Sequence, residues 1–304
     1  MLNTEISGLR MKNPLILASG ILDEVGSTMS EIGKQAGALV TKSIGMEPRE
    51  GYGNPAVIPM EHGILNAVGL ANPGIDEFGE EIAEAKKGGA PVIGSVFSDD
   101  YEGFGYLAGR MEDYGADAVE LNLSCPHAKG YGLEVGSSPE GVKKAVESAL
   151  SSVKIPIFAK LTPNTHDISA LALAAHEAGA SGVVAINTVK GMAINIDAGM
   201  PVLANKVGGY SGPAIKPIGL RLVYEIYPAF EREGARIPII GVGGITTGTD
   251  AIEYMMAGAS ALQVGSAFHY RGKDTMKLIA EEMEAFLKEK GYGSIKEVVG
   301  LAHL

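Results

Sequence analysis

The chain has 304 residues and a formal net charge of −11, with 46% hydrophobic and 20% charged residues. This composition is typical of one globular domain spanning residues 1–304 and excludes a disordered chain. An acidic balance without a Lys/Arg-rich run also disfavours a nucleic-acid partner. Residues 1–14 lack the pattern of a signal peptide, and no apolar run approaches the ~18 residues of a membrane span, so we expect a cytoplasmic protein without membrane contact.

Residues 4–14, with Gly8 at their centre, predict a small N-terminal hairpin. Eight short apolar runs then alternate with helical patterns, which is typical of a parallel sheet, and eight is the number of strands at which such a sheet closes. We therefore predict an α/β fold, a (β/α)8 TIM barrel with the hairpin closing its bottom. The predicted strands are residues 15–18, 38–43, 91–96, 118–123, 157–161, 182–187, 238–243 and 261–265.

Helical spacing of apolar residues predicts helices between these strands. Ser138 followed by Pro139 is typical of a helix start, and Gly179 and Gly258 mark helix ends. Residues 103–108 nominally match a G-x-G-x-x-A dinucleotide-binding loop, but no strand precedes them, so we assign no such site. The predicted helices are residues 25–36, 76–87, 139–151, 167–178, 220–232, 249–256 and 275–290.

Two strand-to-helix connections, residues 44–75 and 187–220, are unusually long. Both follow the carboxyl ends of strands, which is the face where barrel enzymes place their active sites. Structureless loops of that length in a compact domain are usually functional. We therefore expect long loops over an active site at this face.

The chain contains one cysteine, Cys125. A lone cysteine is more often an inert buried side chain. This one, however, follows the end of a predicted strand beside Asn122 and precedes a glycine-rich loop, and a thiol with a pKa of ~8.5 can act as a base near neutral pH. We take Cys125 as the candidate catalytic base. One cysteine cannot supply the four thiolates of an iron–sulfur cluster, so any such cluster would lie on another chain.

Polar residues end several other predicted strands: Lys42, Lys160, Asn187 and Thr188. Lysine is seldom fully buried, so a lysine at the end of an apolar strand indicates an anionic or electron-rich partner, although a side chain that reaches solvent would give the same pattern. The loop of residues 66–70 adds an amide and backbone N–H groups that could bind a small polar ring.

The last two predicted strands end in glycine, at Gly243 and Gly244 and at Gly265 before Ser266. Glycine lets backbone N–H groups approach a phosphate, and these two loops form the usual phosphate site of a barrel. The pattern favours a phosphorylated ligand without identifying it. The six histidines show no metal-ligand spacing, so we expect no metal.

Taken together, these motifs resemble family 1 of the dihydroorotate dehydrogenases over nearly the whole chain. The resemblance implies that FMN binds at the barrel mouth, that dihydroorotate is the substrate, and that Cys125 is the general base. The implied FMN contacts are Ser19, Lys42, Ser43, Asn122, Lys160, Ile186, Gly212, Gly243, Gly244, Gly265 and Ser266. The implied substrate contacts are Lys42, Asn66, Ala67, Val68, Gly69, Leu70, Asn122, Asn187 and Thr188.

Residues 66–74 are most similar to the NAD-linked subclass, 1B. That similarity implies a partner subunit carrying FAD and a [2Fe–2S] cluster, and a homodimer of this chain within a heterotetramer. Two positions depart from the family pattern: Ser95 replaces an asparagine near FMN, and His127 replaces the asparagine that usually follows Cys-Pro. These departures concern one flavin contact and the loop after Cys125, and they leave the base unchanged.

Alternatives remain at this point. A fumarate-linked dihydroorotate dehydrogenase or a dihydropyrimidine dehydrogenase-like flavoenzyme would share the cysteine loop. A barrel synthase or isomerase would use the glycine loops for a substrate phosphate and bind no flavin, and a non-catalytic FMN-binding module would bind flavin without reacting. Flavin absorbance separates the synthase from the others, and bleaching by dihydroorotate separates the inert module.

Overall fold

The computed structural model describes residues 1–124 and 135–304, and its centre is a closed barrel of eight parallel strands. Around the barrel the strands follow the order β10-β15-β16-β3-β4-β7-β8-β9. All eight predicted strands are present, which confirms the TIM barrel. Their bounds are β3 (Leu15–Leu17), β4 (Ala38–Val40), β7 (Val92–Val96), β8 (Ala118–Asn122), β9 (Ile157–Lys160), β10 (Gly182–Ala185), β15 (Ile239–Val242) and β16 (Ala261–Val264).

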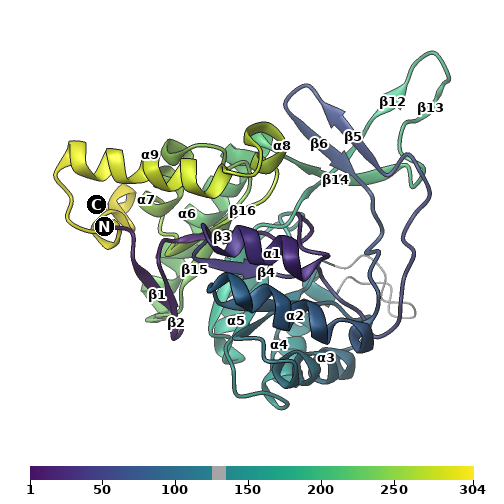
Figure 1. Ribbon diagram of the computed structural model, residues 1–304, viewed down its shortest axis with the longest axis horizontal. Helices are drawn as coiled ribbons and strands as arrows, with labels where there is room; N and C mark the ends of the chain where they lie inside the picture. The colour runs from purple at the N-terminus through teal and green to yellow at the C-terminus, as the bar shows by residue number, and fades with distance from the viewer. Residues whose placement is uncertain (125–134) are drawn as a thin grey trace.

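Helices cover the outside of the barrel (Figure 1). The seven predicted helices are present as α1 (Gly26–Gly33), α2 (Gly79–Ala85), α4 (Pro139–Leu150), α5 (Ile168–Glu177), α6 (Lys216–Glu233), α7 (Gly248–Met256) and α9 (Thr275–Lys290). Single 3-10 turns are η1 (Ile75–Glu77), η2 (Lys86–Gly88), η3 (Val135–Ser137), η4 (Pro213–Ile215), η5 (Ile295–Val298) and η6 (Leu301–His303). Within the described part of the chain, every helix is too short or too polar to cross a bilayer.

Two helices were not predicted, α3 (Tyr101–Asp113) and α8 (Ala267–Arg271). The first begins at Asp100, whose carboxylate accepts the Gly103 N–H at 2.6 Å. Its glycines weaken the helical signal in the sequence. They also allow close packing, because a Cβ at Gly105 would meet Ser148 of α4 at 2.9 Å. The G-x-G-x-x-A match of residues 103–108 therefore lies inside a helix, which agrees with the absence of a dinucleotide loop there.

The predicted N-terminal hairpin consists of β1 (Thr4–Ile6) and the antiparallel β2 (Leu9–Met11). Its buried side chains pack against the residues that point into the barrel near the amino ends of the strands. The hairpin therefore closes the bottom of the barrel, as predicted. The buried residues of this floor are Ile6, Leu9, Met11, Ile16, Ala38, Val40, Ile93, Ala118, Phe158, Val184, Ile240 and Ala261.

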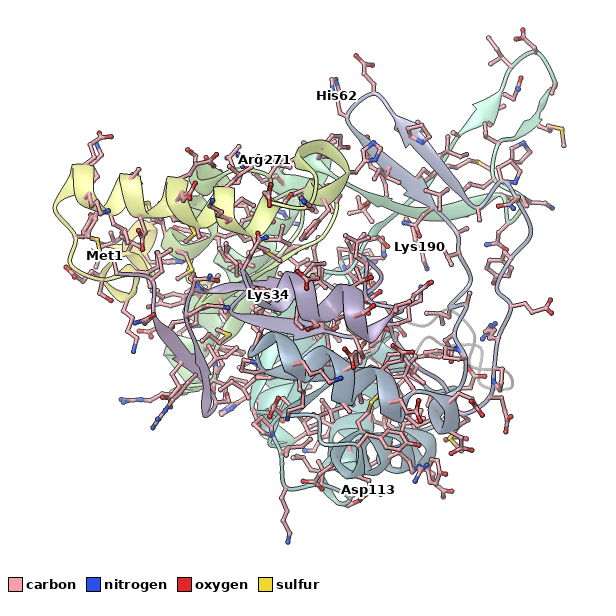
Figure 2. The ribbon with its side chains drawn as sticks, viewed as in Figure 1. Met1, Lys34, His62, Asp113, Lys190 and Arg271 are labelled. Carbon is pink, nitrogen blue, oxygen red and sulfur yellow. The ribbon has the colours of Figure 1, made fainter. Side chains whose placement is uncertain are left out.

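The two long connections are not structureless, contrary to the sequence-based expectation. They contain β5 (Val57–Met60), β6 (Gly63–Asn66), β11 (Val189–Met192) and β14 (Val207–Ser211), which form an antiparallel sheet in the order β11-β14-β6-β5. A smaller ladder joins β12 (Ile194–Asn195) to β13 (Met200–Pro201). This sheet projects beside the barrel mouth (Figure 1), and His62 marks the outer end of its β5–β6 hairpin (Figure 2).

These strands escaped prediction because they are short and contain glycine, which weakens a strand signal. The glycines are needed where the two connections meet. A Cβ at Gly208 would lie 2.3 Å from the Asn66 carbonyl oxygen, and a Cβ at Gly209 would lie 2.1 Å from Thr188 Oγ1. The close approach brings residues from both connections to one place beside the barrel mouth.

Candidate active site

A group of hydrogen-bonded side chains at the barrel mouth is centred on Ser43. Its hydroxyl lies 3.2 Å from Ser19 Oγ and 2.8 Å from Ser95 Oγ, and it accepts a hydrogen bond from Asn122 Nδ2 at 3.1 Å. Asn122 Oδ1 in turn accepts from Asn187 Nδ2 at 3.1 Å. These five residues come from the carboxyl ends of β3, β4, β7, β8 and β10, of which the first four are consecutive around the barrel. The group therefore fixes these strand ends relative to one another.

The backbone of β4 places Ser43 in this group. The strand ends at Val40, and the next residue, Thr41, uses its hydroxyl oxygen to accept the Ser95 N–H at 2.9 Å. Pairing with β7 resumes at Ile44, whose N–H donates to the Ser95 carbonyl at 2.9 Å. The observed strand β4 is therefore shorter than the predicted strand of residues 38–43, because the Thr41 hydroxyl replaces a backbone carbonyl as the acceptor for the Ser95 N–H.

Lys42 lies beside this group and is 9% exposed. The Lys42 ammonium pairs with Glu24 at 3.0 Å, and the Lys42 backbone N–H donates to the Asp23 carbonyl at 3.4 Å. Asp23 itself is buried. Burial raises the pKa of its carboxyl to about 6, although the Gly20 N–H, at 2.5 Å from Oδ2, and the charge of Lys42 oppose the rise. Among the described residues, Asp23 Oδ1 has no hydrogen-bond partner.

Lys160 lies deeper in the barrel, with 5% of its surface exposed. Its ammonium donates to Glu120 Oε1 at 3.3 Å and to Gln263 Oε1 at 3.0 Å. Glu120 and Gln263 are each 1% exposed, so the ion pair lies out of water. A buried charge is tolerated when it is paired and hydrogen-bonded, and this arrangement provides both.

The loop of residues 66–70 meets Thr188 at the small sheet. Asn66 Nδ2 donates to the Gly209 carbonyl at 3.2 Å, and Gly209 packs directly on Thr188. The Thr188 N–H donates to Asn187 Oδ1 at 2.8 Å, which connects the loop to the Ser43-centred group. Asn66, Asn187 and Thr188, three of the predicted substrate contacts, therefore lie around one place.

The shape of that loop depends on Asn72, which was not predicted as a site residue. Its Oδ1 accepts N–H groups from Gly45 at 3.2 Å and Gly74 at 2.9 Å, and its Nδ2 donates to the Leu70 carbonyl at 2.8 Å. Leu70 has a φ of 58°, a left-handed conformation that is unusual for leucine. The three hydrogen bonds of Asn72 hold this conformation in place.

The glycine loops lie on the other side of the mouth. Gly243 and Gly244 have φ values of 128° and 68°, so both use conformations that favour glycine. A Cβ at Gly244 would lie 2.8 Å from the Gly212 carbonyl oxygen, and one at Gly243 would lie 3.6 Å from Ile186. At the next strand end, a Cβ at Gly265 would lie 3.4 Å from Ala18.

Two side chains of α7 support these loops and were not predicted from the sequence. The Tyr254 hydroxyl donates to the Gly243 carbonyl at 2.7 Å, and burial raises its pKa, as do the nearby charges of Asp250 and Glu253. Burial opposes ionisation of Asp250, but hydrogen bonds from Lys216 and Thr246 outweigh it and lower the pKa of its carboxyl to about 2. Asp250 is therefore ionised at neutral pH and anchors the chain that follows Gly244.

Cys125, the predicted base, lies outside the described residues. The residue before it is described: the Ser124 N–H donates to Asn122 Oδ1 at 3.3 Å, so the chain leaves β8 at the Ser43-centred group. Among the described residues, the buried Ser124 hydroxyl has no partner.

Comparison with known proteins identifies the family. The sequence model described as dihydroorotate dehydrogenase matches residues 1–287. The chain belongs to the dihydroorotate dehydrogenase family. Three similar relatives are each named "Dihydroorotate dehydrogenase B (NAD(+)), catalytic subunit". The protein of Thermoplasma acidophilum is 53% identical over 302 residues, which cover 99% of this chain and 98% of the relative. That of Pyrococcus abyssi is 51% identical, covering 99% of each chain, and that of Methanocaldococcus jannaschii is 51% identical, covering 100% of this chain and 98% of the relative.

Dihydroorotate dehydrogenases bind FMN, and the residues at this mouth fit that cofactor. The backbone carries no side chains at Gly243, Gly244 and Gly265, where a phosphate can approach N–H groups, and Ser266 directly precedes α8. Hydroxyl, amide and ammonium groups gather on the opposite side, and the buried Ser124 hydroxyl has no described partner. Of the predicted residues, hydrogen bonds join Ser19, Ser43, Asn122 and Asn187 at the mouth. Asn66 and Thr188 lie beside them, and Lys160 lies deeper in the barrel.

Proposed function

We propose that this chain oxidises dihydroorotate to orotate in pyrimidine biosynthesis, with FMN held at the barrel mouth. The observation that carries the proposal is the hydrogen-bonded group of Ser19, Ser43, Asn122 and Asn187 at that mouth, in a chain that belongs to the dihydroorotate dehydrogenase family. The names of the relatives support the same reaction and disfavour a phosphate-binding synthase without flavin.

In this proposal, the asparagine side chains bind and orient the substrate. Asn66, Asn122 and Asn187 offer both N–H donors and carbonyl acceptors, which suit the ring amides and carboxylate of dihydroorotate. Holding the substrate in one orientation beside the catalytic groups lowers the entropic part of the activation barrier. When bound, FMN supplies the acceptor for the hydride that leaves C6 of the substrate.

Cys125 removes the proton from C5 of the substrate. A free cysteine thiol, with a pKa of ~8.5, is partly ionised to the thiolate near neutral pH, and the thiolate can act as a general base. Lys42 at the mouth and Lys160 below it place positive charge near the proposed ligands, where it would stabilise negative charge on the substrate or the flavin. The proposed FMN contacts are those assigned by resemblance, from Ser19 to Ser266, and the proposed substrate contacts are Lys42, residues 66–70, Asn122, Asn187 and Thr188.

Anaerobic titration of the purified chain with dihydroorotate tests the proposal. We expect visible flavin absorbance in the isolated protein, bleaching by dihydroorotate, and formation of one orotate per flavin. Uracil and thymine serve as matched controls for a dihydropyrimidine dehydrogenase-like activity. A colourless protein that binds no added FMN, or a flavin that dihydroorotate leaves oxidised, would contradict the proposal.

We also propose that electrons leave this chain for NAD through a partner subunit that carries FAD and a [2Fe–2S] cluster. Two copies of this chain would form a dimer within the heterotetramer. The words "catalytic subunit" and "NAD(+)" in the names of the relatives support a partner and this acceptor. The isolated chain should therefore reduce its own FMN with dihydroorotate but pass electrons to NAD slowly. Rapid reduction of NAD by the isolated chain, or fumarate as the preferred acceptor, would contradict this part.

We further propose that the chain is one domain and works in the cytoplasm. Calorimetry of the FMN-bound chain tests the first point, with a single cooperative transition as the expected result. Fractionation of the native cells tests the second.

A further inference from the structure

Three polar side chains form a closed ring of hydrogen bonds across the barrel, below the mouth. Glu120 lies on β8, Lys160 on the adjacent β9, and Gln263 on β16, which is four strands away from β8 in either direction. Lys160 donates to Glu120 and Gln263, and Gln263 Nε2 donates to Glu120 Oε2. The ring therefore joins opposite sides of the barrel.

The ring is the first polar layer above the apolar floor. Each of its residues follows, by two positions, a floor residue on the same strand: Ala118, Phe158 or Ala261. Side chains two residues apart in a strand point to the same face, so the ring lies directly above the floor. Asn122, two positions beyond Glu120 on β8, already belongs to the mouth. The ring thus lies directly above the floor and borders the Ser43-centred group, because Glu120 pairs in register with Ser95 on β7.

Each hydrogen bond of the ring fixes the others. Glu120 accepts at both carboxylate oxygens, from Lys160 at one and from Gln263 at the other. The Gln263 amide has one possible orientation, because its carbonyl accepts from Lys160 while its NH₂ donates to Glu120. Within the described part of the chain, two acceptors take two of the three Lys160 N–H groups and one N–H group remains.

We propose that Glu120 is a positioning residue for the cofactor: with Gln263 it fixes the Lys160 ammonium below the flavin and offsets its charge. The inference rests on the proposed function in that FMN occupies the mouth. The Lys160 charge would favour the reduced, anionic flavin, and the Glu120 carboxylate limits that preference. Glu120 touches neither substrate nor flavin in this proposal and acts through Lys160.

The first test replaces the charge and keeps the shape, with Glu120→Gln. The ammonium loses its counter-charge, so reduced FMN should bind about tenfold more tightly relative to oxidised FMN than in the wild type, which for a two-electron couple raises the midpoint potential by about 30 mV. Lys160→Met should shift the potential in the opposite direction. Glu177→Gln is the matched control, because it makes the same chemical change at an exposed position of α5 and should shift nothing.

Combining Glu120→Gln with Lys160→Met distinguishes an effect of Glu120 through Lys160 from a direct effect of the Glu120 charge on the flavin. If Glu120 acts through Lys160, then Glu120→Gln should shift the potential less than half as much in the Lys160→Met background as in the wild type, because coupled sites are not additive. Equal shifts in both backgrounds would overturn the proposal, as would an unchanged potential in Glu120→Gln.

Gln263→Leu keeps the inference testable if Glu120→Gln does not fold. This change keeps both charges and removes only the amide. The midpoint potential should therefore shift by less than the shift expected for Glu120→Gln. The affinity of the apoprotein for FMN, measured by quenching of flavin fluorescence, should fall at least about threefold because Lys160 loses one of its acceptors. Unchanged affinity and potential in this variant would overturn the proposal.

The same preparations distinguish this inference from the proposed function. A wild-type chain that binds FMN but is not bleached by dihydroorotate would contradict the proposed reaction, while the potentials of the variants would still decide the role of Glu120. A wild-type chain that binds no FMN would overturn both.

Discussion

The lower and upper halves of the barrel interior use the same strands but opposite kinds of side chain. On β8, Ala118 belongs to the apolar floor, Glu120 to the polar ring and Asn122 to the mouth. On β9, Phe158 and Lys160 divide in the same way. A strand of four or five residues therefore contributes to stability at its amino end and to binding at its carboxyl end.

This division has an energetic reason. Polar groups in the upper half lose hydration, and their hydrogen bonds return only part of that free energy. The lower half removes large apolar side chains from water, at about 1.5–3 kcal/mol for each fully buried one, and the N-terminal hairpin completes the enclosure. Changes in the lower half should therefore lower the free energy of unfolding and leave catalysis almost unchanged. Changes at the catalytic and binding residues of the upper half should reduce catalysis and leave stability almost unchanged.

The largest expected effect is that of Cys125→Ala, which removes the proposed base. Without the base, turnover should fall about 10³- to 10⁴-fold. FMN should stay bound, because its proposed contacts on other strands, and Asn122 at the end of β8, are unchanged. Turnover and flavin content measured on one preparation check this. Cys125→Ser is the control and should retain slight activity that rises with pH, since a hydroxyl is a far weaker acid than a thiol. Wild-type turnover in the alanine variant would remove Cys125 from its assigned role.

The matching test of the lower half is Phe158→Ala. This side chain is fully buried in the floor, so the change should lower the free energy of unfolding by about 4 kcal/mol. Turnover per bound flavin, measured well below the melting temperature, should stay within about twofold, because the ring above the floor is unchanged. Urea denaturation and steady-state assays of one preparation test both statements. Loss of turnover without loss of stability would mean that the two halves are not separate.

The sequence predicted the fold well because the strands of a buried parallel sheet are apolar runs with clear ends. The eight strands and the hairpin under them were all predicted. Helix α3 and the small antiparallel sheet were not, since their glycines weaken local signals and only tertiary packing explains those glycines.

Several predicted mouth residues, such as Lys42 and Gly243, end strands or lie in glycine loops, so their position in the sequence indicated them. Others, such as Ser19, Ile186 and Gly212, were implied only by the resemblance to the family. The residues that support the mouth carry weaker signals. Glu120 and Gln263 are single polar residues within apolar strands, which could have indicated a buried partner. Asp23 and Asn72 bond mainly to residues within three positions, and such short polar turns are common in loops. The contacts of Asn72 with Gly45 and of Tyr254 with Gly243 join parts of the chain that are distant in the sequence, so no local pattern identifies them.

At the edge of the mouth, Lys42→Ala should slow flavin reduction by dihydroorotate about 10²-fold and weaken substrate binding. The reason is that this ammonium would face both ligands, and a charged hydrogen bond is worth about 1.5–3 kcal/mol. Stopped-flow reduction at several dihydroorotate concentrations separates rate from affinity. Lys34→Ala is the matched control, since Lys34 lies on the surface at the end of α1 (Figure 2). Normal binding and reduction in Lys42→Ala would place the end of β4 outside the site.

The smallest expected effect concerns Asp23, a charged group that the upper half buries without a full set of partners. The pKa of Asp23 is about 6 in the folded chain, above the ordinary aspartate value of 3.8 that applies in the unfolded chain, so the folded state favours the protonated form. The stability that this group contributes is therefore present below pH 4 and lost as the pH rises through 6.

Asp23→Asn removes the ionisation and keeps an acceptor for the Gly20 N–H. A rise of about two pKa units corresponds to about 3 kcal/mol, and a weaker hydrogen bond from Gly20 reduces the gain, so the variant should be more stable by about 2 kcal/mol at pH 7.5. The gain should shrink as the pH falls toward 4. Urea denaturation across this range, at fixed excess FMN, measures it, and Asp99→Asn on an exposed loop is the control. A gain that is the same at every pH would show that Asp23 does not ionise near pH 6 and that its burial has another basis.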